Sequence, residues 1–147
     1  MDETTYPFSD KVLDRAFTFE FWEADLKAWR DRVAIEVEQS LLATVFPVLE
    51  SLYAAFLPAR RHFGYRTCDE VLGFCAASSG VETVQAIDAA VLAKVLPKVR
   101  GEAGGGLPEA LTKAAEVCAA AGLQQSAAKL TQMQATLGQI GVVRFWS

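Results

Sequence analysis

The spacing of apolar residues from Glu23 onward constrains the fold most, because it is helical almost throughout. Between Cys68 and Cys75, for example, apolar residues recur at i, i+3, i+4 and i+7, which places them on one face of a helix. Prolines and glycines separate the helical segments. The expected helices cover residues 25–38, 41–57, 65–77, a segment carrying Val84, Ile87, Val91 and Val95, and residues 107–121 and 126–137.

Single residues predict where these helices begin and end. Pro47 predicts either a helix start or a kink, since proline lacks the N–H that a helix interior uses. Pro58 is expected to end the apolar helix, and Pro97 to end or kink the helix before it. Four glycines in residues 101–106 predict a flexible loop, and Ser126 could cap the last helix.

A different periodicity marks the two ends of the chain. In residues 17–22, phenylalanines alternate with other residues, as in a strand with one buried face, and a short helix is expected before them over 10–15. Residues 142–146 form a second short strand or a packed tail. The predicted fold class is therefore mainly α, with one or two short strands at the chain ends. An unpaired strand over 17–22 would cause self-association or would pair with 142–146.

Composition and charge exclude several classes of protein. A hydrophobic content of 52% with a net charge of −4 excludes a globally disordered chain. A sequence pI near 5.0 argues against binding nucleic acid through bulk charge, so contact with DNA would be indirect. No window long enough to cross a membrane is free of charge, so no membrane association is expected. The N-terminus lacks a signal pattern, and an odd count of three cysteines favours a reducing, cytoplasmic location.

The sequence contains no complete active site. The glycines of residues 101–106 have the spacing of a phosphate-binding loop, but Leu107 and Pro108 follow where lysine and a hydroxyl residue would be needed. His62 is the only histidine, which excludes metal sites built on several histidines. The cysteines are expected to pack in the core rather than to react.

Residues 1–21 carry the pattern Val-Leu-Asp-Arg-Ala just before the alternating phenylalanines. This stretch resembles the segment after the sensor-1 strand in McrB-like, restriction-associated AAA+ ATPases. The rest of the chain is similar to the C-terminal helical lid of that group, through residues 63–72, 86–101, 126–137 and 141–146. The resemblance implies that residues 1–22 are the end of an α/β core and that residues 23–147 are a helical lid domain of the AAA+ type.

The resemblance also suggests roles for two arginines. Arg15 matches the position of an arginine finger, which reaches the nucleotide of a neighbouring subunit and stabilises charge on the transferred phosphoryl group. The alternative is a surface arginine paired with Asp10 or Asp14.

Arg66 matches the sensor-2 arginine at the start of a lid helix, which would contact the γ-phosphate from within the same subunit. Its basic neighbours at residues 60–62 suit an anionic partner, although the alternative is a solvated basic loop. Asp69 and Glu70 favour helix initiation, and they could also pair with Arg66 and hold it.

The Walker A and Walker B motifs of the AAA+ group are absent from this sequence. This chain alone is therefore expected to bind no cofactor and to be inactive, whereas the complete family protein uses ATP or GTP with Mg. The implied partners are an AAA+ core, neighbouring ring subunits and a McrC-like nuclease, and the implied role is in DNA restriction and defence. The alternative is a standalone helical protein-interaction module, which would dock through the phenylalanines of residues 17–22. A DNA-binding helical domain is disfavoured by the net charge of −4.

Overall fold

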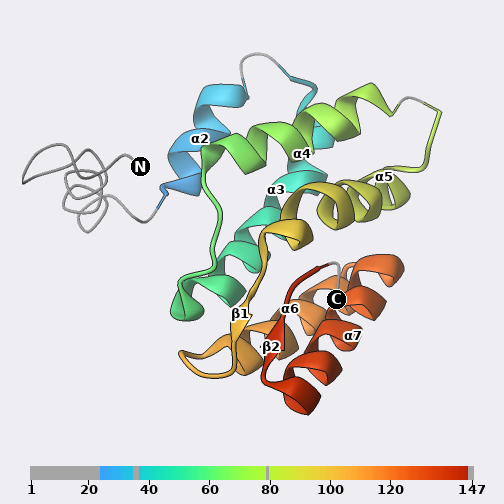
Figure 1. Cartoon of the computed structure of the whole chain (residues 1–147). Helices are drawn as coiled ribbons and strands as arrows, with labels where there is room; N and C mark the ends of the chain where they lie inside the picture. The colour runs from blue at the N-terminus through green and yellow to red at the C-terminus, as the bar shows by residue number, and fades with distance from the viewer. Residues whose placement is uncertain (1–23, 35–36, 79, 146–147) are drawn as a thin grey trace, which may run out of the picture.

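The computed structural model describes residues 24–34, 37–78 and 80–145. Within these residues the chain is mainly helical, with a small two-stranded sheet (Figure 1). The expected helix over 10–15 and strand over 17–22 lie outside the described residues. The helices are α2 (Leu26–Val33), α3 (Gln39–Phe56), α4 (Tyr65–Ala77), α5 (Thr83–Ala90), α6 (Leu107–Ala120) and α7 (Gln124–Ile140), and the strands are β1 (Gly101–Glu102) and β2 (Val142–Val143).

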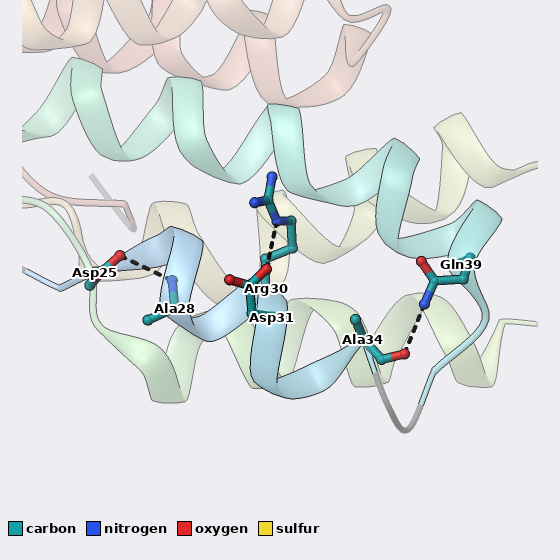
Figure 2. A network of polar contacts seen from close by, with 6 residues as sticks. All are labelled: Asp25, Ala28, Arg30, Asp31, Ala34 and Gln39. Atoms are coloured by element: carbon teal, nitrogen blue, oxygen red, sulfur yellow. Dashed lines mark hydrogen bonds and ion pairs between the residues drawn. The ribbon is translucent and has the colours of Figure 1, made fainter.

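Helix α2 is shorter than the helix that the sequence predicts over 25–38. The Asp25 side chain caps its start by accepting a hydrogen bond from the Ala28 N–H at 3.0 Å. After its end, the Ala34 carbonyl accepts a hydrogen bond from the side-chain amide of Gln39, the first residue of α3 (Figure 2). A side-chain contact thus joins the end of α2 to the start of α3.

Helix α3 is the central element, in contact with α2, α4, α5 and α6. Pro47 lies inside α3, so the expectation that it starts a helix is wrong. The helix ends at Phe56, and Pro58 follows in a 3-10 turn over Leu57–Ala59, as expected. Its fully buried side chains form much of the core: Val45, Leu49, Leu52 and Phe56.

The segment Gln39–Ala59 is long and apolar enough to cross a membrane by length and composition, with a mean hydropathy of 1.6. Half of this window is buried inside the fold. One such helix is weak evidence for a membrane span, because the core helix of a soluble protein has the same length and composition.

Helix α5 continues through a π-helical turn, Val91–Val95, and a 3-10 turn, Leu96–Lys98. Pro97 lies in the 3-10 turn, and the helical path stops there, as the sequence predicts. Val91 and Val95 are both buried, so the wider π turn keeps the apolar stripe of α5 facing the core.

Helices α6 and α7 pack against each other, and the start of α7 corrects an expectation. Ser126 does not cap this helix, because α7 begins at Gln124 and Ser126 is buried within it. The cap comes instead from Asp88 of α5, whose carboxylate accepts hydrogen bonds from the N–H groups of Gln125 at 2.9 Å and Ser126 at 2.8 Å. The Ser126 hydroxyl donates to the Asp88 carbonyl oxygen.

The sheet is antiparallel and pairs Gly101 with Val143 and Glu102 with Val142. Figure 1 shows β1 and β2 side by side, with β2 next to α7. The expected loop over 101–106 therefore begins as a strand, and the expected C-terminal strand is confirmed over two residues. Pairing between 17–22 and the C-terminal segment stays a prediction, because 17–22 lie outside the described residues.

Candidate functional site

Arg66 lies in the first turn of α4, and its side chain is exposed. The N-cap residue of this helix is Gly64, which has no side chain to cap the first turn. Within residues 24–34, 37–78 and 80–145, the Arg66 side chain makes no hydrogen bond or ion pair. Its guanidinium is therefore open to an external anion.

The two carboxylates nearest to Arg66 along α4 are engaged elsewhere. Asp69 accepts a hydrogen bond from the Trp29 indole N–H at 2.8 Å, and it lies 3.7 Å from the Arg32 guanidinium. Glu70 forms an ion pair of 3.2 Å with Lys98. The expectation that Asp69 or Glu70 holds Arg66 is thus wrong, because side chains from distant segments take both carboxylates.

Lys98 fastens the 3-10 turn after α5 to the first turns of α4. Its ammonium donates a hydrogen bond to the hydroxyl of the buried Thr67 at 2.5 Å, in addition to the ion pair with Glu70. These contacts fix the backbone directly after Arg66, so the Arg66 side chain projects from an anchored first turn of α4.

The basic cluster at residues 60–62 does not act as one surface. The Arg61 side chain extends to a segment 39 positions away, where its Nε donates a hydrogen bond of 2.8 Å to the Arg100 carbonyl oxygen. The half-buried His62 ring packs edge-on against Tyr53, with 5.1 Å between ring centroids. Arg60 occupies the left-handed region at φ 56°, in the tight turn that ends the 3-10 segment.

A groove of about 690 Å³ lies beside the two-stranded sheet. We call it the basic groove, because cationic side chains from three separate segments line it together with apolar residues of β2 and the end of α7. Sequence reasoning missed this site, although Lys98 and Arg100 lie close together in the sequence and could have indicated a local positive charge. The lining residues are Arg61, Lys98, Arg100, Gly101, Glu102, Ile140, Val142, Val143 and Arg144.

A family model described as a domain of unknown function, DUF8727, matches residues 18–142. The chain belongs to this family. The DUF8727 match covers all the helices that the structure describes, and it includes Arg66. Arg15 precedes the DUF8727 match and also lies outside the described residues. Neither a curated protein nor a solved structure matches the chain.

The cysteines in the described part of the DUF8727 domain have a structural role. All three cysteines are buried, as expected, and burial raises the pKa of the Cys68 and Cys118 thiols to about 12 and of Cys75 to about 11. Among the described residues, no group of three or more His, Cys, Asp or Glu side chains could hold a metal ion.

Proposed function

We propose that this chain is the C-terminal lid portion of a McrB-like AAA+ nucleoside triphosphatase. In this proposal, Arg66 contacts the γ-phosphate when the lid is closed over a nucleotide held by an AAA+ core, and it loses that contact when the lid opens. The difference in contact couples the nucleotide state to ring motion in DNA restriction or defence. Arg15 would serve as the finger toward a neighbouring subunit.

The observation that carries the proposal is the unpaired state of Arg66 beside two carboxylates that are already engaged. A guanidinium left exposed at a helix start can form two parallel hydrogen bonds to phosphate oxygens. The helix N-terminus adds a favourable dipole for an anion at the same place. Because Lys98 and Trp29 bond Thr67 and Asp69 of α4, motion of the helical body would carry Arg66 with it.

The residues described here fit a contribution to a nucleotide site rather than a whole site. Arg66 supplies a phosphate ligand, while the magnesium ligands and the phosphate loop would come from the Walker A and Walker B motifs of the core. ATP or GTP with Mg would supply the phosphoryl chemistry when bound there. The McrC-like nuclease and the ring subunits are partners under the same proposal.

The test is to measure ATP and GTP turnover of the full chain alone and after mixing with a McrB-like core that carries both Walker motifs. The chain alone is expected to show background turnover, and the mixture to show stimulated turnover. Arg66→Ala is expected to lower the stimulated rate on the order of 10²-fold, because it removes a preorganised cation from the transferred phosphoryl group. Arg66→Lys should recover part of the rate, since it keeps the charge but loses the planar fork.

Lys27→Ala is the matched control, because Lys27 is an exposed cation on α2. This variant should stimulate the core as the unchanged chain does. Turnover by the isolated chain that Arg66→Ala abolishes would contradict the proposal, because the active site would then be complete within 147 residues.

A further inference from the structure

The basic groove is positively charged although the chain as a whole has a net charge of −4. Arg61 uses its Nε to bond a neutral carbonyl oxygen, so that bond leaves its positive charge unneutralised. The Arg100 side chain makes no hydrogen bond or ion pair within the described residues. Lys98 is paired with Glu70, and among the described residues Glu102 is the one carboxylate that lines the groove. The charge balance favours an anionic occupant.

The same groove also has an exposed apolar side. Ile140 at the end of α7 is 64% exposed, and Val142 of β2 is 46% exposed. Large apolar side chains are otherwise mostly buried in the described part of the chain, and within that part this adjacent pair forms an exposed apolar surface on one groove. A small inorganic anion would leave this apolar side unused.

Gly101 leaves room for the Arg61 guanidinium on the cationic side of the groove. A Cβ atom at this position would lie 2.8 Å from the Nη2 atom of Arg61, too close for a carbon atom to stay without displacement. The absence of a side chain lets the Arg61 guanidinium lie against β1, where it reaches the Arg100 carbonyl. The Arg61 guanidinium is thereby held against β1, whose partner strand β2 carries the exposed Val142.

We infer that the basic groove binds an extended acidic segment of a partner protein in which carboxylates alternate with apolar side chains. The carboxylates pair with Arg61 and Arg100, and the apolar side chains cover Val142 and Ile140. Such a segment would contact both the cationic and the apolar side of the groove, whereas a purely charged ligand would contact only the cationic side. The inference is independent of the nucleotide proposal, since neither Arg66 nor a nucleotide takes part.

The test is fluorescence anisotropy of the full chain with a labelled peptide in which Glu alternates with Leu. Saturable binding that weakens with added salt is expected, since the paired charges are near the surface. Arg100→Glu should weaken binding about tenfold or more, because it removes one attraction and adds a repulsion. Val142→Ser should also weaken binding, because it removes apolar contact while leaving every charge in place.

Lys27→Glu on α2 is the matched control, with the same change in net charge outside the groove, and it should bind as the unchanged chain does. Circular dichroism should show equal folding of all variants, because each changed side chain is exposed. A peptide in which Glu alternates with Ser should bind more weakly than the Glu-Leu peptide.

Three outcomes would overturn the inference. Equal loss of affinity in Arg100→Glu and Lys27→Glu would indicate nonspecific attraction. Equal affinity for the Glu-Ser and Glu-Leu peptides would indicate a purely charged ligand, because the apolar side of the groove would then contribute nothing. A change of oligomeric state in Arg100→Glu, measured by light scattering, would indicate that the groove joins copies of this chain.

Discussion

Asp88 is the single residue whose replacement should be most informative about stability. It is buried on α5, and its carboxylate accepts two backbone N–H groups at the start of α7. Asp88→Ala is expected to lower the free energy of unfolding by about 2–4 kcal/mol, because it leaves both N–H groups without an acceptor. Urea denaturation monitored by circular dichroism measures this change.

Asp88→Asn retains an acceptor oxygen and should cost less than the alanine variant. Asp31→Ala is the control, because Asp31 is exposed and its 3.5 Å ion pair with Arg30 lies at the surface of α2 (Figure 2). A change within about 0.5 kcal/mol is expected for this variant. An equal loss in Asp31→Ala and Asp88→Ala would contradict the capping role.

At the scale of elements, α3 carries a helix-breaking residue in its interior. Pro47 removes one backbone N–H from the helix and crowds the carbonyl of Ala43. Pro47→Ala is expected to raise the free energy of unfolding by roughly 1–3 kcal/mol, since the gain in the helix exceeds the entropy returned to the unfolded chain. Thermal unfolding should therefore shift to higher temperature.

Pro58→Ala provides the comparison, because Pro58 lies in the first turn of the 3-10 segment, where no N–H bond is needed. That variant should be neutral or slightly less stable, by up to about 1 kcal/mol. If Pro47→Ala lowers the free energy of unfolding instead, the proline does not strain α3.

Local patterns predicted the elements well where neighbours in sequence decide the structure. The helix over 65–77 and the buried stripe that ends at Cys75 are confirmed, because periodicity and the flanking glycine and serine are local signals. The predicted element boundaries were wrong where a residue distant in sequence sets them. Asp88, which caps the start of α7, is 38 positions from Ser126. Residues 101–102 of the predicted loop form a strand because they pair with β2.

The candidate site was predictable only as a list of charges. Arg66 and its neighbours were visible in the sequence, but the partners of Asp69 and Glu70 were not. Trp29 is 40 positions from Asp69, and Lys98 is 28 positions from Glu70. The basic groove combines residues near 61, near 100 and near 142, so no spacing along the chain could have indicated it.

For the whole molecule, the three buried thiols make stability depend on alkaline pH. Burial raises the pKa of Cys68 and Cys118 to about 12 and that of Cys75 to about 11, from an ordinary value of 9.0. The nearby carboxylates of Asp69 and Asp88 add to the rise at Cys68 and Cys118. The folded chain therefore holds these protons more tightly than the unfolded chain does.

The raised pKa values stabilise the fold fully below about pH 9, and this stabilisation is lost as the pH rises toward 11–12. Above pH 9, each thiol should reduce the free energy of unfolding by about 1.4 kcal/mol per pH unit. Urea denaturation at a series of pH values measures the slope.

Cys118→Ala should make the slope shallower, whereas Val117→Ala should lower stability at every pH and leave the slope unchanged. Equal slopes in all three proteins would show that other groups cause the alkaline unfolding.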